Sequence, residues 1–517
     1  MKKLTLLLCF VSFLTNGQNI TVASGKSFTI EKTGAVTMSG NFSNAGTFIL
    51  NSDSDEFSSL IIGGSVTGNI TYNRYVNSVG TNEWDLIGAP VSGQSINSFV
   101  TANTSTLATN GATKAIGYYN NTDNTWTNYT TSTIVGAGNF PLGKGFQMAT
   151  NANGTGILSF TGAPTATNQT WTIIDNDAAN SGAGTRWNLV ANPFPSYIYG
   201  NANADSSHNF LTVNSDKLND SYEAIYGYDA DGSGYTVYNN TSAALRLAPG
   251  QAFMVASDNA ENDTISFTTA MRTTTGGDDL IVGRDPIDSF ELVLKLYEGD
   301  SEIDHTKFYF GDGLSLNLDP GYDAGHFNQG ASLMSRLVEE DEGVGLVINA
   351  MGLESVNDVV APLELNIEAG NNFRISIGTF NIDTAINVYL EDNVQETMTL
   401  LNDQDFELTA ENELSGVGRF FIHLTETLLS IDDKIETNYL NVFKADVNNF
   451  ITVEGLANQS NGTKLRLYTI RGKEVTFTTL NNTNNKQTIS TQGLSTGIYI
   501  VKLESGNILL TKKLFIK

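Results

Sequence analysis

Cysteine is almost absent from this sequence, and so are long apolar runs. The single cysteine, Cys9, lies inside an apolar stretch at residues 4–14 that follows two lysines. This stretch is too short to span a bilayer, which needs about 20 residues, and it predicts a secretory signal peptide. We expect residues 1–17 to be removed by cleavage between Gly17 and Gln18. The mature chain would then have no disulfide, no cysteine-based metal site and no transmembrane segment.

Basic residues are also scarce, with 28 Lys and Arg against 55 Asp and Glu and a net charge of −27. A nucleic-acid partner requires a basic face that can replace the counterions of the phosphates. The sequence therefore disfavours nucleic acid as a partner. It is compatible with a soluble acidic surface and with cation binding.

Histidine is rare, and no pair of histidines has the spacing of a metal site on a helix or hairpin. Neither an HExxH motif nor a Gly-x-Ser-x-Gly nucleophile motif is present. We therefore expect no catalytic residues and no enzymatic activity, although paired carboxylates for glycoside cleavage cannot be recognised from sequence spacing. The four histidines are His208, His305, His326 and His423.

Short strands fill the chain, because apolar-alternating runs are separated by turn residues such as Asn-Gly, Asp-Gly and Gly-Asn. This pattern predicts an all-β fold. In residues 18–76 the runs are about four residues long, and glycines separate them. A short β-solenoid and a stack of hairpins both fit that spacing.

An internal repeat follows. Each copy starts with a Trp-led apolar strand closed by a proline, and a tyrosine cluster comes next. A Gly-rich entry to a strand and a Ser-Phe strand complete both copies in the same order. Four landmarks in one order predict tandem β-sandwich-like units. The anchors are Trp84 and Pro90 in the first copy (80–165), and Trp187 and Pro193 in the second (183–270).

The aromatic residues of the repeat have two interpretations. Tryptophan and tyrosine in apolar strands bury large areas, so they suit the core of twin sandwiches. The same residues, if exposed, would form platforms for sugars or proteins. The exposure of Trp84, Trp126, Trp171 and Trp187 separates the two interpretations.

Residues 285–427 are strongly acidic, with 28 Asp and Glu against 5 Lys and Arg. Their clear apolar–polar alternation predicts an antiparallel β-sandwich with a polar outer face. Calcium is the one cofactor that this region suggests. Asp312, Asp319 and Asp323 are the candidate ligands, because nearby glycines would let the loop turn its oxygens inward.

The charge reverses in the last part of the chain. Residues 437–517 hold 10 Lys and Arg against 4 Asp and Glu. So abrupt a change marks a domain boundary, with residues 428–436 as the linker. The segments 464–475 and 494–503 alternate around tight turns, which predicts a small C-terminal β-sandwich.

This C-terminal segment resembles the C-terminal sorting domain of type IX secretion substrates, found in the Bacteroidota. The resemblance implies transport across the outer membrane by the type IX machinery, removal of this domain, and frequent attachment of the remainder to the cell surface. Three segments carry it: 467–475, 494–503 and 512–517. Their matching residues are Leu467, Tyr468, Gly472, Lys473, Gly497, Ile498, Tyr499, Lys502, Lys513 and Lys517.

The sequence thus favours a secreted or surface-displayed, non-enzymatic protein of adhesion or structural type. One alternative is a carbohydrate-binding surface protein, and another is a secreted hydrolase of unrecognised type. A surface glycan or another cell-surface protein would be the partner, besides the secretion machinery.

Overall fold

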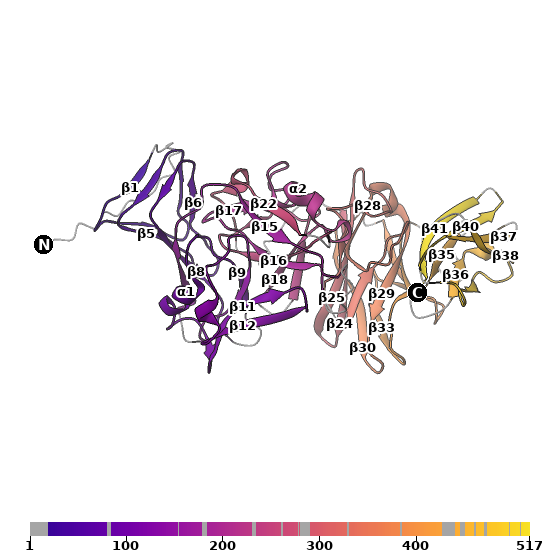
Figure 1. Ribbon diagram of the computed structural model, residues 1–517. Coiled ribbons are helices and arrows are strands. Elements are labelled where there is room, and N and C mark those ends of the chain that lie inside the picture. Colours follow the sequence, from indigo (N-terminus) through magenta and orange to yellow (C-terminus); the bar gives the residue numbers. More distant parts are fainter. Residues whose placement is uncertain are drawn as a thin grey trace. The chain divides into compact units, whose positions relative to one another are not determined.

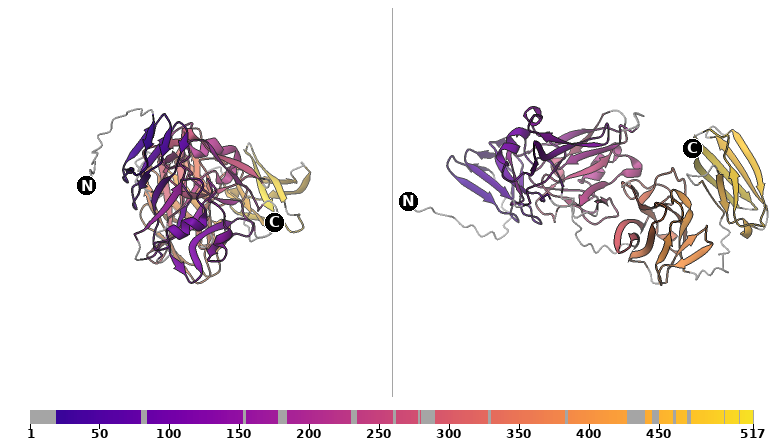
Figure 2. Two further views of the ribbon diagram at one scale, coloured as in Figure 1. Left: turned by 60° about the vertical axis from the view of Figure 1, so that its left-hand side comes forward. Right: turned by 90° about the horizontal axis from the view of Figure 1, so that it is seen from below.

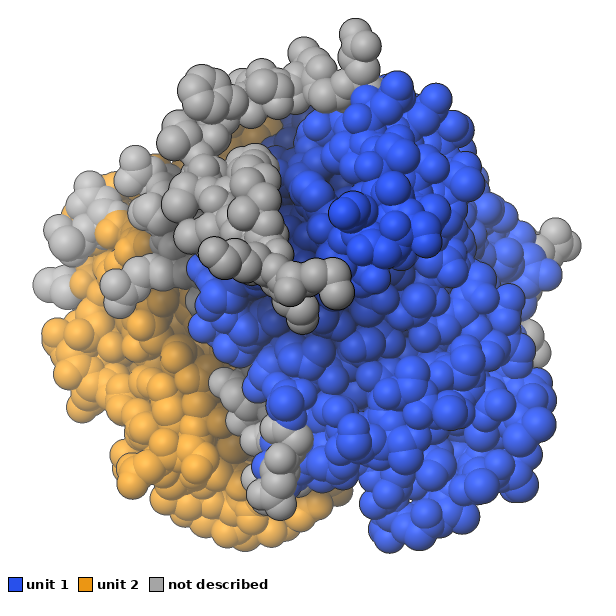
Figure 3. Space-filling view, turned by 90° about the vertical axis from the view of Figure 1, so that its left-hand side faces the viewer, with its two compact units in different colours: residues 1–217, 227–236, 244–283 blue, residues 218–226, 237–243, 284–517 orange. Residues whose placement is uncertain are grey.

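The computed structural model describes most of the chain, which divides into two compact units (Figure 3). Unit 1 comprises residues 1–217, 227–236 and 244–283, and unit 2 comprises 218–226, 237–243 and 284–517. The described residues are 19–79, 84–152, 155–177, 184–229, 234–259, 262–277, 279, 290–327, 330–382, 385–426, 440–444, 450–459, 462–469, 473–495, 497–506 and 508–516. The predicted cleavage position at Gly17 and Gln18 and the predicted linker 428–436 lie outside them.

Unit 1 opens with three columns of parallel strands, drawn in indigo in Figures 1 and 2. Each strand pairs with the strand one coil later in the chain, so the coils stack on one another. The columns are β1 (Ile20–Val22), β4 (Phe42–Asn44) and β7 (Val66–Thr67); β2 (Ser27–Ile30), β5 (Thr47–Asn51) and β8 (Ile70–Tyr75); and β3 (Ala35–Met38) and β6 (Ser59–Ile62).

Parallel pairing distinguishes the two arrangements that the sequence left open for this region. Strands of a hairpin stack would pair antiparallel, whereas these columns have the coil-over-coil pairing of a short solenoid. Apolar side chains such as Phe42, Phe48 and Leu50 point inward and are fully buried. They form one core with the first repeat, which includes Phe99 and Phe146.

Both copies of the sequence repeat form a sheet with the same strand order. In the first copy the order is β9–β13–β11 with β12 on β11, and in the second it is β16–β21–β18–β19. The first sheet contains β9 (Asp85–Ile87), β10 (Thr109–Asn110), β11 (Thr113–Asn120), β12 (Thr125–Thr130) and β13 (Phe146–Met148). The second contains β16 (Trp187–Ala191), β18 (Ile225–Asp229), β19 (Gly234–Tyr238) and β21 (Ala252–Ala256).

The two sheets also share their register. Phe146 pairs with Ile87 in the first sheet, and Phe253 pairs with Val190 at the corresponding place in the second. Each copy adds one short helix and one outer strand. These are α1 (Ile96–Ala102) with β14 (Ile157–Gly162), and α2 (Phe210–Asn214) with β22 (Asp263–Phe267).

Backbone hydrogen bonds join the two copies in a symmetric way. The Gly88 N–H donates to the Gly250 carbonyl at 2.7 Å, and the Ala191 N–H donates to the Gly143 carbonyl at 2.9 Å. Gly88 and Ala191 hold the same position in their copies, as do Gly143 and Gly250. The contact is close: a Cβ on Gly88 would lie 2.3 Å from the Ala191 Cβ. The Gly-rich segments of the repeat are therefore needed where one copy meets the other.

Several short strands and 3-10 helices remain to be placed. The strands are β15 (Gln169–Ile173), which pairs with β22, and β17 (Tyr197–Tyr199), which pairs with β20 (Arg246–Leu247) and β23 (Arg272–Thr273). The 3-10 helices of unit 1 are η1 (Ile134–Gly136), η2 (Ser215–Lys217) and η4 (Thr269–Met271), whereas η3 (Asp220–Tyr222) belongs to unit 2.

The acidic region forms one eleven-stranded sheet in unit 2. Its order is β32–β31–β34–β29–β27–β28–β25–β24–β30–β33, with β26 on β28. The strands are β24 (Phe290–Glu298), β25 (Ser301–Gly311), β26 (Ala324–Gly325), β27 (Ser332–Ser335), β28 (Leu346–Gly352), β29 (Asp358–Asn366), β30 (Asn372–Phe380), β31 (Asn387–Asp392), β32 (Thr397–Leu400), β33 (Phe406–Thr409) and β34 (Val417–Thr425). The helix η5 (Leu353–Asn357) lies between β28 and β29.

This sheet corrects the expected two-sheet antiparallel sandwich. It curls over one core, because Phe420 of β34 contacts Phe406 of β33 with ring centroids 5.8 Å apart, although these strands are distant in the sheet order. It also contains one parallel pair, β25 with β28. The apolar–polar alternation predicts that each strand has one buried face, and the structure confirms this. It does not say whether one sheet or two cover the core.

The C-terminal part of unit 2 has two sheets over one core. One has the order β35–β36–β39 and the other β38–β37–β40–β41. Their bounds are β35 (Asn441–Lys444), β36 (Phe450–Glu454), β37 (Thr463–Thr469), β38 (Glu474–Leu480), β39 (Gln487–Ser490), β40 (Gly497–Ser505) and β41 (Ile508–Ile516), with η6 (Leu456–Asn458) after β36. None of the helices in the described ranges is long and apolar enough to cross a membrane.

The contact between the copies yields a stability prediction. Gly88→Ala places a Cβ against Ala191 and against the Lys144 carbonyl oxygen, 2.9 Å away. We expect it to lower the free energy of unfolding of the mature chain by about 1–3 kcal/mol in chemical denaturation, as overpacking does. Gly136→Ala is the matched control, because nothing lies within 4 Å of its Cβ position. Equal stability of the two variants would contradict the close contact.

Candidate functional site

A pair of aromatic rings lies across the hairpin of β11 and β12. Tyr119 is directly opposite Trp126, and their ring centroids are 5.2 Å apart. Directly paired residues of adjacent strands point to the same face of a sheet, so the two rings form one surface. Trp126 is 37% exposed, which makes it one of the few large apolar side chains that face solvent among the described residues.

The second repeat has an aromatic pair at the same place. Tyr228 of β18 and Tyr235 of β19 have ring centroids 5.3 Å apart. Burial raises the pKa of Tyr235, and the neighbouring hydroxyls of Tyr228 and Tyr119 add to the rise. Tyr119 belongs to the first pair, so the two pairs lie near each other where the repeats meet.

Asparagine side chains fix the loop beside these rings. The Asn121 side-chain amide donates to the Ile174 carbonyl and to Asn188 Oδ1, both at 3.1 Å. Asn176 donates to Asn121 Oδ1 at 2.9 Å. The Tyr119 hydroxyl lies 2.8 Å from the Thr185 hydroxyl, so the network reaches the aromatic surface. These contacts hold the first pair in place before any ligand binds.

The turn between β11 and β12 contains one charged side chain. Thr125 and Thr127 flank Trp126 along β12 and are exposed on the opposite face of the strand. Asp123 is the single acidic side chain of the β11–β12 turn, and it accepts a hydrogen bond from the Thr125 hydroxyl at 2.6 Å. On the face of the rings, the Tyr119 hydroxyl donates to Asn124 Oδ1 at 2.8 Å.

The other three tryptophans are half-buried and form no continuous row with Trp126. Trp84 packs against a small alanine cluster just before β9. Trp171 lies 5.9 Å from the Lys144 ammonium, which also faces the rings of Tyr118 and Phe146. Trp187 opens β16, in the same place as Trp84 in its copy. The prolines that close the two strands, Pro90 and Pro193, are buried.

The histidines pair with carboxylates. His326 Nε2 lies 2.8 Å from Asp304 Oδ2, with both side chains buried, and the same oxygen accepts the Leu333 N–H at 2.9 Å. His423 Nε2 lies 2.8 Å from Glu391. The pairing of Asp304 with His326, which are 22 residues apart, is not visible from neighbouring positions in the sequence. His208 and His305 are more exposed and lie near Asp205 and Glu302.

The candidate calcium ligands do not converge. Asp323 accepts the Ala350 N–H at 2.7 Å and the Asp319 N–H at 2.6 Å. Asp319 in turn accepts the Ser315 N–H at 2.7 Å. These carboxylates thus brace the loop, and Asp312 is not part of that set. Across the residues that the structure describes, no group of three or more His, Cys, Asp or Glu could hold a metal ion.

Two buried carboxyls of unit 2 have raised pKa values. Burial raises the pKa of Asp323 to about 7 against the opposing effect of its backbone donors. Burial and the charge of Asp220 raise the pKa of Glu223 to about 7. Glu223 lies beside the same loop, where a Cβ on Gly321 would approach its Oε1 to 3.1 Å.

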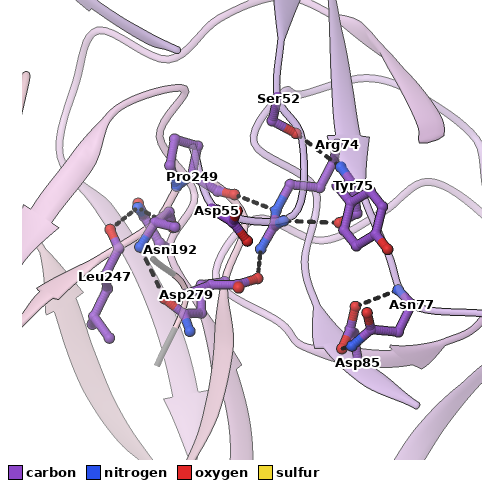
Figure 4. A network of polar contacts seen from close by, with 12 residues as sticks. Ser52, Asp55, Arg74, Tyr75, Asn77, Asp85, Asn192, Leu247, Pro249 and Asp279 are labelled. Atoms are coloured by element: carbon purple, nitrogen blue, oxygen red, sulfur yellow. Dashed lines mark hydrogen bonds and ion pairs between the residues drawn. The ribbon is translucent and has the colours of Figure 1, made fainter. Parts of the chain in front are cut away.

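A buried arginine joins distant parts of unit 1 (Figure 4). Arg74 of β8 has no exposed side-chain surface and forms an ion pair with Asp279. Its guanidinium also donates to the Pro249 carbonyl at 3.1 Å and to the Tyr75 carbonyl at 2.8 Å. It covers the Phe57 ring at 4.1 Å. Arg74 therefore connects the solenoid to the second repeat, through Pro249, and to Asp279, which follows the second repeat in the chain.

A second carboxyl adjoins this network. Loss of solvent and the charge of Asp279 raise the pKa of Asp85, although Arg74 and the two hydrogen bonds from Asn77 oppose the rise. Shifted carboxyls often mark active sites. Here every polar group has a protein partner, so the arrangement is that of a structural junction.

The described sorting residues lie on three neighbouring strands, β37, β40 and β41, and just before β38. Leu467 and Tyr468 are on β37, which pairs with β40, where Tyr499 and Lys502 lie. Leu467 and Tyr499 are buried, and the Tyr499 hydroxyl donates to the Ser495 carbonyl at 2.8 Å. Gly497 and Ile498 begin β40, Lys513 lies on β41, and Lys473 is exposed just before β38, whereas Gly472 and Lys517 lie outside the described residues.

Only one member of each aromatic pair was recognised as part of a cluster from the sequence. Its tyrosine clusters include Tyr119 and Tyr228, but their partners Trp126 and Tyr235 were not connected with them. The available signal was the shared offset: each partner follows its tyrosine by the same number of residues in both copies. That offset fixes a hairpin register and hence a cross-strand pair.

Comparisons with known proteins identify two segments. Residues 10–423 match the family model described as "Domain of unknown function (DUF8693)", and residues 445–517 match "Secretion system C-terminal sorting domain". The second match confirms the resemblance of the C-terminal segment to type IX sorting domains. No curated protein matches the chain.

A solved structure, the adhesin domain of Epf from Streptococcus pyogenes, is 11% identical to this chain. The alignment covers 31% of this chain and 76% of that one, with a TM-score of 0.12. That score is far below the level at which two chains share an overall fold, so the likeness carries no argument about function.

Removal of the buried cation tests the junction in unit 1. Arg74→Met leaves Asp279 and Asp85 without their positive partner, and breaking a buried pair costs about 3–5 kcal/mol. We expect this loss in chemical denaturation of the mature chain. Lys32→Met is the control, because the exposed pairs of Lys32 with Asp53 and Glu56 should contribute nothing measurable. An Arg74→Met variant as stable as wild type would contradict the structural role of Arg74.

The raised pKa of Glu223 predicts a pH effect. Between the ordinary pKa of a glutamate and about 7, the folded chain holds a proton that the unfolded chain has released, so the contribution of Glu223 to stability falls as the pH rises. Glu223→Gln should therefore gain stability relative to wild type from about pH 5 to about pH 8, measured by thermal unfolding. The exposed Glu411→Gln should show no such trend, and a flat difference for Glu223→Gln would exclude the effect.

Proposed function

We propose that this chain, which belongs to the family described as Domain of unknown function (DUF8693), is a non-enzymatic binding protein of adhesion type. Residues 445–517 are a sorting domain, so the chain is a substrate of the secretion machinery and is secreted or held at the outer cell surface. The proposal concerns what the exported part does there. It binds a partner through the aromatic surface of the paired repeats.

One observation carries this proposal: an aromatic pair recurs at the same place in both repeats, and Trp126 in it is exposed. A sheet that only supports the fold places polar residues on its solvent face. Exposed tryptophan and tyrosine are instead the residues that dominate binding energy at recognition surfaces.

The alternative of a secreted hydrolase has less support. The best-shielded histidine–carboxylate pair, His326 with Asp304, is buried, and its carboxylate also accepts a backbone N–H. A general base needs to reach a substrate proton directly or through one water. The pair is better explained as a brace inside the curled sheet.

Export can be tested by truncation. Deleting residues 437–517 should leave the chain in the periplasm, because the sorting domain is the part that the machinery recognises. Fractionation of cells and medium with an antibody to unit 1 measures this, and protease resistance of the retained chain shows that it is folded. A truncated chain found in the medium or on the outer surface would be incompatible with the assignment.

Binding can be tested on intact cells. Cells displaying the Trp126→Ala, Tyr235→Ala double variant should co-sediment with mixed-species biofilm material at least about tenfold less than cells displaying wild type, the scale of one binding hot spot. Val135→Ala is the matched control, because Val135 is 72% exposed elsewhere in the first repeat. Equal co-sedimentation of all three strains would disprove a binding role for this surface.

A further inference from the structure

We infer that the two aromatic pairs together form a binding surface for a neutral polysaccharide. Each pair would stack on the face of a sugar ring, and a chain of several sugars would span both. This inference rests on the proposed function, since it names the chemical class of the partner that the aromatic surface binds. Four features of unit 1 support it, and the charge of the chain favours a neutral ligand.

The first feature is the shape that the two pairs offer. The rings of Tyr119 and Trp126, and those of Tyr228 and Tyr235, are tilted by 53° and 60° within each pair. A sugar ring has an apolar C–H face and polar edges, and aromatic faces pack on apolar surfaces of that size. Two such pairs side by side offer successive stacking positions, as in other proteins that bind chain-like ligands through ring platforms.

The second feature is the set of groups beside the rings. The Tyr119 hydroxyl donates to the Asn124 side-chain oxygen at 2.8 Å. Asn128 lies two residues along β12 from Trp126, so its amide is on the same face of the sheet as the rings. Hydroxyls and amides can donate and accept hydrogen bonds, which matches the hydroxyls along a sugar edge. An apolar protein partner would leave these groups unpaired, and that loss is costly.

Charge selects a neutral ligand. Asp123 lies in the turn between the two strands, and its charge is one of the causes that raise the pKa of Tyr119. The chain as a whole carries −27. A polyanion, whether a uronic-acid polymer or a nucleic acid, would meet like charge on approach. A neutral polysaccharide meets none.

Rigidity is the third feature, and it lowers the entropic cost of binding. The amide network of Asn121, Asn176 and Asn188 fixes the turn beside Tyr119. The symmetric backbone bonds from Gly88 and Ala191 fix one repeat against the other. A ligand that spans two positions gains affinity only when their separation is constant, because the second contact is then made at high effective concentration.

The fourth feature is the sequence of the outer strands. β12 (TWTNYT) and β19 (GYTVY) each pair with one strand in the described sheets and contain no charged residue. Proteins usually protect such edges with charges or proline against unwanted strand pairing. Uncharged edges that carry an exposed ring at Trp126 and a half-buried ring at Tyr235 suit a surface that is covered by a ligand.

Affinity electrophoresis of the purified mature chain tests the ligand class. The probes are a mixed-linkage β-glucan, a xylan and a galactomannan, with polygalacturonate as the anionic comparison. We expect at least one neutral probe to retard the chain. Trp126→Ala should weaken that retardation about tenfold, and adding Tyr235→Ala should weaken it further. Trp126→Phe, which keeps a ring, should retain most of the binding, and Val135→Ala should match wild type.

The outcomes separate this inference from the proposed function. Retardation by none of the neutral probes, or by polygalacturonate alone, overturns the neutral-polysaccharide assignment, and so does equal retardation of Trp126→Ala and wild type. If cells still require Trp126 for co-sedimentation in that case, the binding function stands and its ligand is another class. If co-sedimentation is also independent of Trp126, the proposed function fails with it. Thermal unfolding of each variant excludes loss of folding as the cause.

Discussion

The backbone contact between the two repeats is the constraint on which unit 1 depends. Gly88 and Ala191 occupy one position of the repeat, and Gly143 and Gly250 occupy another. The Gly88 N–H donates to the Gly250 carbonyl, and the Ala191 N–H donates to the Gly143 carbonyl. The contact is so close that Gly88 has no room for a Cβ. Because the bonds are symmetric, any feature present in both copies is presented twice in related positions. The aromatic pairs are one such feature.

A buried ion pair also constrains unit 1. Arg74 is fully buried, and its partners come from the solenoid, from the second repeat and from Asp279. Burying an ion pair costs much of what the attraction returns, so the net gain in stability is small. The ion pair instead enforces one placement of the second repeat, because any other placement would leave a charge without a partner. Apolar contacts alone, being non-directional, would not select one placement.

The sequence predicted the features that depend on local pattern, and it failed where pairing between distant strands decides. Short strands, the repeat landmarks and the charge reversal before the sorting domain all follow from neighbouring residues. The parallel columns of the solenoid do not, because Phe48 in a hairpin stack would alternate in the same way. The curl that brings Phe420 to Phe406 is equally invisible, and it replaced the expected sandwich. Trp126 was noticed only as a tryptophan, since its partner depends on register.

The aromatic surface also has a cost that argues for its role. Trp126 lies on an outer strand without charged residues, which invites pairing with other chains. The rest of the protein shows the opposite tendency, since the acidic region alone has 28 acidic residues that keep chains apart. A surface feature that raises the risk of aggregation, occurs in both repeats and is held rigid by buried amides needs a reason beyond packing. Ligand binding supplies one, because a bound ligand covers the rings and the strand edge together.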